Sequence, residues 1–396
     1  MAAPVLRLGA AAPGVLALPS AQPAADTLYA PRGVFWSDRS CVVADSGNHR
    51  VLIWHERPTQ AGQPADVVLG QPTMEAEGPR AGETDPRRGL HLPCGVAVID
   101  GRLVVADAWN HRLLIWDTLP QEDFAAPDHV LGQPTAESVE ANAGGEPTAQ
   151  TLHWPYGFDL VGGVFWVADT GNRRVLGWDG LPEPGQPARY LLGQDDAQTR
   201  DENRGREVGH GTYRWPHDVT GDAGRLLVAD AGDHRIVGWD GHPVPERDFD
   251  LVLGQDDVTT GSEWPYAAPG DRATRFPYAI SFDGEVPGGG RLAAADTANN
   301  RVLVWDDLPR HGLGAPATRV LGQRDFDGAG ENRWDAIRDD TLCWPYGLHL
   351  CGDALAIADS GNNRVVVWDL AAEAPPAPDG SEAASLLRGA GPAVLT

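Results

Sequence analysis

A segment of twelve residues recurs six times along this chain, and the recurrence constrains the fold more than any other feature. Each copy begins with an apolar stretch that ends in Ala-Asp, and it closes with a second apolar stretch that begins with Arg and ends with Trp. The six copies lie at 43–54, 105–116, 167–178, 228–239, 294–305 and 357–368. The aspartates of successive copies are 62, 62, 61, 66 and 63 residues apart. A period of this length indicates a closed or stacked repeat architecture, in which each unit needs its neighbours to bury a core.

Each period contains four short apolar stretches separated by turn residues. In the second period they are residues 95–99, 102–107, 112–116 and 129–132, and their Val, Leu, Ile and Trp content is typical of β-strands. The third stretch is apolar at nearly every position, so both faces of its sheet must be covered. Sheets that stand as blades around an axis meet this requirement. The sequence therefore predicts an all-β fold, a six-bladed β-propeller with four antiparallel strands per blade.

A single propeller domain is predicted for residues 1–370, because six small cores between blades replace one large core. Residues 371–396 are read as a Pro- and Ala-rich C-terminal tail. We expect an N-terminal strand at 5–9 to close the ring, since Gly9 precedes Pro31 by 22 residues and the matching spacing elsewhere is 23. Pairing this strand with the last blade would cover an open sheet edge. Residues 385–389 are the alternative source of that strand.

Charge and composition exclude several classes of function. The formal net charge of −25 opposes binding to nucleic acid or to an anionic membrane. The sequence has no apolar run of 18 residues, so no membrane-spanning helix is predicted. Its four cysteines show no regular spacing and favour a reducing compartment. We therefore expect a cytoplasmic, soluble monomer.

The Asp, Asn and Arg of each copy fall in the predicted turn between the second and third strands. Asp and Asn accept backbone N–H groups in such turns, and we expect the Arg to pair with the Asp. We expect glycines to supply left-handed backbone there, at Gly47, Gly171, Gly232 and Gly361. Six equivalent positions rarely all perform chemistry, so we interpret this set as structural.

These residues also carry a family resemblance. Pro93-Cys94-Gly95-Val96, followed by VADAWNHRL at 105–113, resembles the NHL repeat, and the resemblance extends over essentially the whole chain. It implies a propeller of this type but specifies function poorly. NHL propellers include protein-binding scaffolds, RNA-binding modules and peptidylglycine-amidating lyases, and the related six-bladed lactonases hold calcium in their channel.

Function is expected where equivalent positions differ between blades. We look for it on the top face, defined as the face with the long loops that lead into the innermost strands. The residue after the proline that opens each innermost strand is Arg32, Cys94, Tyr156, His217, Tyr278 or Tyr346. Two places before that proline stand Tyr29, His91, His153, Arg214, Arg275 and Cys343. We expect both sets to surround the channel mouth. The residue just before the proline is expected to pack between blades, at Leu92, Trp154, Trp215, Phe276 and Trp344.

The leading functional hypothesis is a scaffold that binds another protein and needs no cofactor. The long top loops are rich in Asp and Glu, which suits a basic partner through charge complementarity. This hypothesis places the binding surface on an acidic top face.

Two alternatives place the function at the channel mouth. Pro216-His217-Asp218 resembles the Pro-His elements through which amidating lyases hold zinc, which suggests a metal-dependent lyase or hydrolase. Its candidate ligands for zinc or copper are His91, Cys94, His153 and His217, and the acidic loops would suit calcium. The second alternative is a small polar or anionic ligand held by Arg32, Tyr156, His217, Tyr278 and Tyr346. No nucleophile motif or phosphate loop stands out, so no catalytic residue is assigned.

Overall fold

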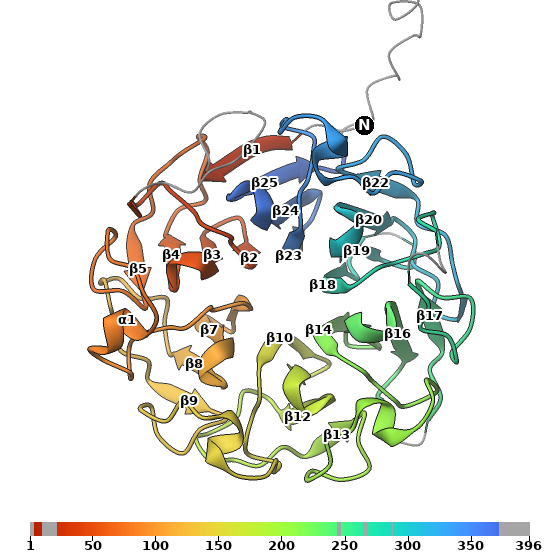
Figure 1. Cartoon of the computed structure of the whole chain (residues 1–396), viewed down its shortest axis with the longest axis horizontal. Coiled ribbons are helices and arrows are strands. Elements are labelled where there is room, and N and C mark those ends of the chain that lie inside the picture. The colour runs from red at the N-terminus through yellow and green to blue at the C-terminus, as the bar shows by residue number, and fades with distance from the viewer. Residues whose placement is uncertain (1–3, 10–21, 244–246, 264–267, 287, 372–396) are drawn as a thin grey trace, which may run out of the picture.

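The computed structural model describes residues 4–9, 22–243, 247–263, 268–286 and 288–371. Six antiparallel sheets stand around a central axis (Figure 1), which confirms the predicted six-bladed β-propeller. Within the described residues, the helical segments are one single turn, α1 (Arg80–Glu83), and short 3₁₀ turns. Of the predicted C-terminal tail, only residue 371 lies among the described residues.

The first three blades follow one another along the chain, each with its strands ordered from the axis outward. Blade 1 consists of β2 (Gly33–Trp36), β3 (Cys41–Asp45), β4 (Arg50–Trp54) and β5 (Val67–Leu69). Blade 2 consists of β6 (Val96–Ile99), β7 (Arg102–Asp107), β8 (Arg112–Trp116) and β9 (His129–Leu131). Blade 3 consists of β10 (Pro155–Val161), β11 (Val164–Asp169), β12 (Arg174–Asp179) and β13 (Tyr190–Leu192).

The remaining blades repeat this order with two variations at their outer edges. Blade 4 consists of β14 (Pro216–Asp222), β15 (Arg225–Asp230), β16 (Arg235–Asp240) and β17 (Leu251–Leu253), and β21 (Gly312–Leu313) adds a short parallel fifth strand. Blade 5 consists of β18 (Pro277–Asp283), β19 (Arg291–Asp296), β20 (Arg301–Trp305) and β22 (Arg319–Leu321). Blade 6 consists of β23 (Pro345–Cys351), β24 (Ala354–Asp359) and β25 (Arg364–Asp369), with β1 (Pro4–Gly9) as its outer strand.

The N-terminal strand closes the ring, as predicted. β1 runs antiparallel to β25, with Pro4 opposite Trp368 and Gly9 opposite Arg364. Leu8 is buried against blade 1 and blade 6. The alternative closing strand, 385–389, lies outside the described residues.

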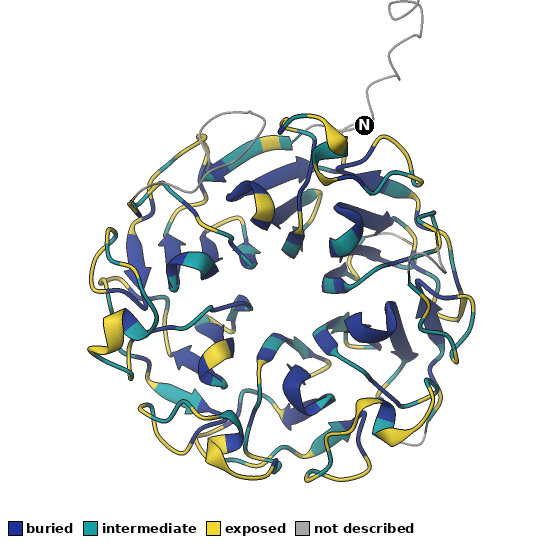
Figure 2. Ribbon diagram, in the orientation of Figure 1, coloured by how far each residue is buried: buried dark blue, intermediate teal, exposed yellow. Residues whose placement is uncertain are grey.

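The core is divided among the gaps between neighbouring blades. Val42 and Ile53 of blade 1, for example, pack with Leu103 and Leu114 of blade 2. All five residues of β8 are buried, because a blade lies on each side of this strand. Figure 2 shows the same division, with buried residues along the strands and exposed residues in the loops of the rim.

The repeated Asp and Arg form a buried ion pair in every blade. In blade 2, Arg112 donates from Nε to Asp107 Oδ2 at 2.7 Å, and neither side chain is exposed. Asp107 also accepts the Asn110 side-chain amide and the His91 backbone N–H. The other five pairs are Asp45–Arg50, Asp169–Arg174, Asp230–Arg235, Asp296–Arg301 and Asp359–Arg364. These contacts confirm the predicted pairing of Arg with Asp.

The prediction that glycine supplies the left-handed backbone in this turn is wrong. The left-handed residue is the one after the repeated Asn, such as His49 with φ of 56°. Gly47 is instead required for space, since a Cβ there would lie 2.5 Å from the Tyr29 carbonyl oxygen. The Gly47 N–H donates to that same oxygen at 2.9 Å.

The left-handed residue also connects five of the six blades to the next. His49 Nδ1 accepts the backbone N–H of Leu92 at 3.1 Å. In blades 2, 4, 5 and 6 the equivalent pairs are His111 with Trp154, His234 with Phe276, Asn300 with Trp344 and Asn363 with Ala30. Burial lowers the pKa of His49, His111 and His234 to about 4, so each imidazole is a neutral acceptor at pH 7.

Replacing these three histidines with asparagine should make the protein more resistant to acid. The histidines titrate near pH 6.5 in the unfolded chain and near 4 in the folded one. The stability they contribute is therefore present above pH 6.5 and is lost as the pH falls towards 4. Asn, which fills this role in blades 5 and 6, does not titrate. Melting temperatures at pH 8, 6, 5 and 4 should fall less steeply in the triple variant than in the wild type.

His311→Asn is the matched control for this comparison, because His311 is mostly exposed on the rim. It should keep the wild-type dependence on pH. Equal slopes for the triple variant and the wild type would contradict the role given to the three links.

Candidate functional site at the central channel

The predicted mouth residues come together at the top end of the channel. The His217 ring is stacked between Tyr156 and Tyr278, with ring centroids 4.2 and 4.3 Å away. Tyr346 lies 4.6 Å from Tyr278, and the Arg32 guanidinium lies 4.7 Å over the Tyr346 ring. These side chains pack against one another, so the mouth is largely filled by aromatic rings.

His217 and Cys94 are both buried at this mouth. The Nδ1 of His217 lies 2.9 Å from the Tyr278 carbonyl oxygen. Burial lowers the pKa of His217 to about 3. Burial also raises the pKa of the Cys94 thiol to about 11, against the opposing effect of the Arg32 guanidinium. The thiol, a weak ligand, is therefore the dominant form at neutral pH.

The structure does not gather the four candidate metal ligands into one site. His91 contacts the rings of His49 and Trp109, and His153 contacts those of His111 and Trp154. In the part of the chain that the structure describes, no three His, Cys, Asp or Glu side chains are grouped so that they could hold a metal ion. His91 and His153 therefore lie apart from Cys94 and His217, which both line the channel cavity.

Aromatic side chains gather instead on the top face. Trp109 and Trp154 have ring centroids 5.8 Å apart and are 40% and 36% exposed. The expectation that the residue before the proline packs between blades is wrong for Trp154 and Trp344, which is 43% exposed. Trp154 and Trp344 both have a left-handed backbone, with a φ of 50°.

Many carboxylates of the top loops are paired with arginines. Asp195 lies 3.2 Å from Arg204 and 3.0 Å from Arg206. Glu202 lies 3.2 Å from Arg214.

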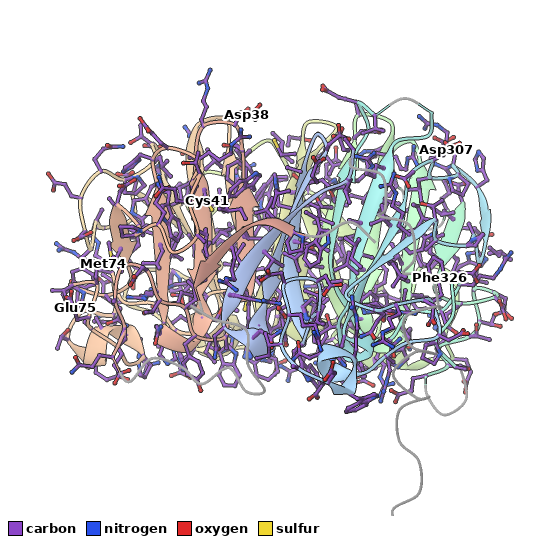
Figure 3. All side chains as sticks on the ribbon, turned by 90° about the horizontal axis from the view of Figure 1, so that it is seen from above. Asp38, Cys41, Met74, Glu75, Asp307 and Phe326 are labelled. Atoms are coloured by element: carbon purple, nitrogen blue, oxygen red, sulfur yellow. The ribbon has the colours of Figure 1, made fainter. Side chains whose placement is uncertain are left out.

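The opposite end of the propeller, the bottom face, also carries acidic turns between first and second strands. These contain Asp38, Asp100, Asp222, Asp283 and Asp353. Figure 3 is oriented with the bottom face uppermost, so Asp38 and Asp307 lie above and Glu75 below. Negative charge is therefore not confined to the top face.

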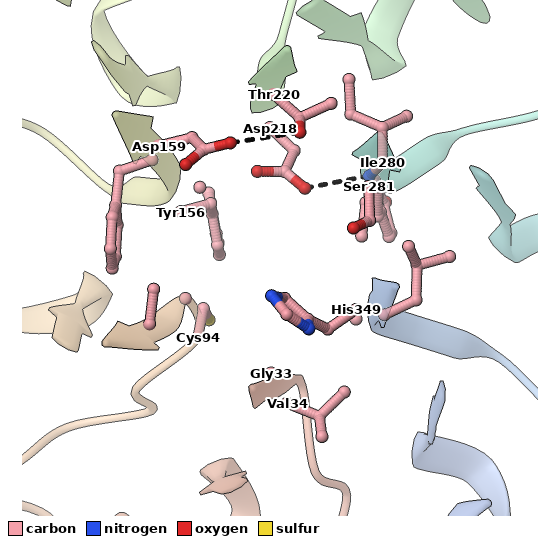
Figure 4. Close-up of a pocket in the computed structure, with 18 of the residues that line it drawn as sticks. Gly33, Val34, Cys94, Tyr156, Asp159, Asp218, Thr220, Ile280, Ser281 and His349 are labelled. Atoms are coloured by element: carbon pink, nitrogen blue, oxygen red, sulfur yellow. Dashed lines mark hydrogen bonds between the residues drawn. The ribbon is translucent and has the colours of Figure 1, made fainter. Parts of the chain in front are cut away.

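A polar cavity of about 170 Å³ lies inside the channel, below the aromatic mouth. Besides the mouth residues, its walls carry Asp159, Asp218, Thr220, Ser281 and His349, polar side chains that sequence reasoning did not single out as site residues. Figure 4 shows the two aspartates on one side of the cavity and the His349 ring pointing in from the other. One sequence feature could have indicated the site: Asp218 occupies a position held by Gly or Ala in the other five blades.

Hydrogen bonds fix the two carboxyl groups. Asp159 accepts the Thr220 hydroxyl at 3.1 Å and the Leu160 N–H at 2.7 Å. Asp218 accepts the Ile280 N–H from blade 5 at 2.9 Å (Figure 4). Burial raises the pKa of Asp159 to about 6 and that of Asp218 to about 8. At pH 7, Asp159 is therefore mostly ionised and Asp218 mostly protonated.

His349 completes the cavity wall on blade 6. Its ring lies 4.8 Å from that of Phe35, and burial lowers its pKa to about 4. Its Nδ1 is buried and has no hydrogen-bond partner among the described residues. A neutral imidazole with a vacant nitrogen thus faces two carboxyl groups across the channel.

No protein-family model and no curated protein matches the chain. Among the described residues, no helix has the length and hydropathy needed to cross a bilayer. Many solved structures are similar to the chain, and three of them illustrate the likeness. The WD40 β-propeller domain of Doa1 is 12% identical, with 91% of this chain and 96% of that chain covered and a TM-score of 0.43. An auxiliary nutrient binding protein from Bacteroides thetaiotaomicron is 11% identical, with 86% and 70% covered and a TM-score of 0.48. Virginiamycin B lyase from Staphylococcus aureus is 12% identical, with 86% and 94% covered and a TM-score of 0.40. At these identities the likeness concerns the fold alone.

Proposed function

We propose that the protein is an NHL-type propeller that acts as a scaffold and binds a basic protein partner through its top face. The repeated Asn, His and Arg support the NHL assignment, because each has a defined contact within or between blades. Asn110 and Arg112 bind Asp107, and His111 binds the next blade. The four described cysteines are free thiols, which is consistent with a reducing compartment.

Exposed aromatic side chains are the observation that carries the scaffold proposal. Among the described residues, the exposed large aromatic side chains all lie on the top loops and turns: Tyr29, Trp109, Trp154, Trp334 and Trp344. Trp334 is 82% exposed. Trp and Tyr are enriched at the energetic centres of protein interfaces, since they bury a large apolar area and lose little side-chain entropy.

The charge around these rings favours a basic partner. Glu75, Glu77, Glu137 and Glu207 are exposed on the top loops. They form no ion pair among the described residues, unlike Asp195 and its neighbours. A cationic side chain of a partner would pair with these carboxylates. It would also contact the faces of the exposed indole rings, which attract cations.

A Trp109→Ala, Trp154→Asn double variant should weaken partner binding at least tenfold without unfolding the blades. Asn is chosen at 154 because it tolerates the left-handed backbone. The measurement is affinity capture of the partner from the native cell extract, followed by titration with the purified partner at low and high salt. Leu313→Ala is the control, since Leu313 is an exposed apolar residue on the outer edge. A partner that binds the wild type and the double variant equally would refute the proposed surface.

A small ligand at the top of the channel is the second candidate. A depression of about 180 Å³ lies beside the mouth, with Trp154, Trp215 and Arg173 among its walls. Tyr156, His217, Tyr278 and Tyr346 form its floor and separate it from the cavity below. Aromatic walls with an arginine suit a flat or anionic molecule, which titration of tryptophan fluorescence would detect.

A further inference from the structure

The channel interior holds negative charge without a matching positive charge. Asp159 and Asp218 line the same cavity, and neither forms an ion pair within the described residues. Of the residues that the structure describes, Arg32 is the one arginine in the cavity wall, and it lies at the mouth against Tyr346. His349, across the cavity, is uncharged at neutral pH. A cation would therefore compensate a carboxylate that the protein itself leaves unpaired.

The hydrogen bonds of Asp218 do not by themselves explain a carboxyl group at this position. Asp218 receives an N–H from the neighbouring blade, but Ser281 receives the Leu350 N–H in the same way at 3.0 Å. Thr220 also accepts an N–H from blade 5, that of Phe282, at 3.3 Å. A hydroxyl therefore suffices for contacts of this kind between blades, and a buried carboxyl is the more costly choice.

We propose that the channel is a binding site for a small primary alkylammonium, whose charged head would lie at Asp159 and Asp218. The cavity volume of about 170 Å³ suits a molecule of this size. Its walls also include Val34, Val96 and Ala97, which would contact a hydrocarbon body. An organic cation fits better than a metal ion, since no three potential metal ligands are grouped here. This site is independent of the top-face surface.

We place the access route on the bottom face. A second pocket lies there and shares Phe282 and Leu350 with the channel cavity. Asp222, Asp283 and Glu285 line this pocket. Its one arginine, Arg310, is paired with Asp240. Carboxylates at the opening of a narrow cleft raise the local concentration of cations, and Asp159 and Asp218 continue the negative potential inward.

Calorimetric titration of the whole protein with butane-1,4-diamine tests the proposal, with butane-1,4-diol as the uncharged counterpart. We expect saturable binding of the diamine and none of the diol. Asp159→Asn should weaken diamine binding at least tenfold, although the amide can keep contacts with Thr220 and Leu160. Asp196→Asn removes the same charge from an exposed top loop and should bind like the wild type. Absence of diamine binding at millimolar concentration, equal binding of the diol, or unchanged binding by Asp159→Asn would each overturn the proposal.

The pH dependence supplies a readout that a purely structural role would not give. The titratable groups that line the cavity with Asp218 are Asp159, His349 and, towards the mouth, Arg32, Cys94, Tyr156, His217, Tyr278 and Tyr346. Of these, Asp159 and Arg32 are charged at pH 7, and Arg32 keeps its charge across the pH range of the experiment. Because a cation favours the ionised form of Asp218, diamine affinity should rise between pH 6 and 8. Asp218→Ala, which places the blade 5 residue in blade 4, should flatten this rise. A wild-type affinity that is constant or falls with pH would count against the site.

Discussion

Deletion of residues 1–9 should open the ring and lower the melting temperature by many degrees. The deletion removes β1, which pairs with β25 along its length, and exposes the apolar residues of β25 that β1 covers. The loss of the buried Leu8 and the partly buried Leu6, with the newly exposed edge, should cost on the order of 5 kcal/mol. Circular dichroism would measure the transition, and light scattering would report aggregation through the open edge.

Truncation after residue 371 is the control for this deletion. Because β1 already occupies the edge of β25, removal of residues 372–396, which include the alternative strand at 385–389, should leave the melting temperature unchanged. If instead the N-terminal deletion melts like the full chain, β1 does not contribute to closure.

Asp107→Asn should destabilise the protein by about 3–5 kcal/mol, because it leaves the Arg112 guanidinium buried without a counter-charge. Asn is nearly isosteric and can still accept one of the contacts, so the effect reports the charge rather than a cavity. Denaturant unfolding monitored by tryptophan fluorescence would measure the loss. The equivalent substitution in another blade should cost a similar amount, since all six pairs are equally buried.

An exposed ion pair provides the comparison. Asp179 lies 2.5 Å from Arg189, at least as close as the buried pair, but more than half of each side chain is exposed. Asp179→Asn should leave the unfolding curve nearly unchanged, because water screens the remaining charge. Equal losses for the two variants would mean that burial does not determine the strength of these pairs.

The fold could be predicted because its determinants recur. The third strand of each blade is apolar on both faces, and the Gly9 to Pro31 spacing identified β1 before its partner was known. The position after the opening proline was correctly expected at the channel mouth, where Tyr156, His217 and Tyr278 stack. In each case a residue could be placed by comparison with the equivalent positions in the other five blades.

The side chains that line the channel interior could not be placed in this way, because the innermost strand of several blades is irregular where it begins. The pairing register shifts between Pro216 and Asp218, and equivalent shifts occur in blades 3, 5 and 6. Such a bulge lets two successive side chains, here His217 and Asp218, approach the axis, where simple alternation would allow one. His91 and His153 were wrongly expected at the channel mouth. Their positions repeat from blade to blade, but they lie farther out, among aromatic rings of the top face.

Ring closure also imposes an order on biosynthesis. A ribosome makes β1 before the other strands of the propeller and β25 after them, so the closing strand has no partner until the sixth blade has been synthesised. The five preceding blades can form and stack as they emerge, since each is local in sequence. The final contact joins residues more than 350 positions apart and carries the largest loop-closure entropy in the fold. Completion of the ring is therefore expected only after β25 has been synthesised, and the unpaired β1 would be the segment most exposed to wrong partners until then.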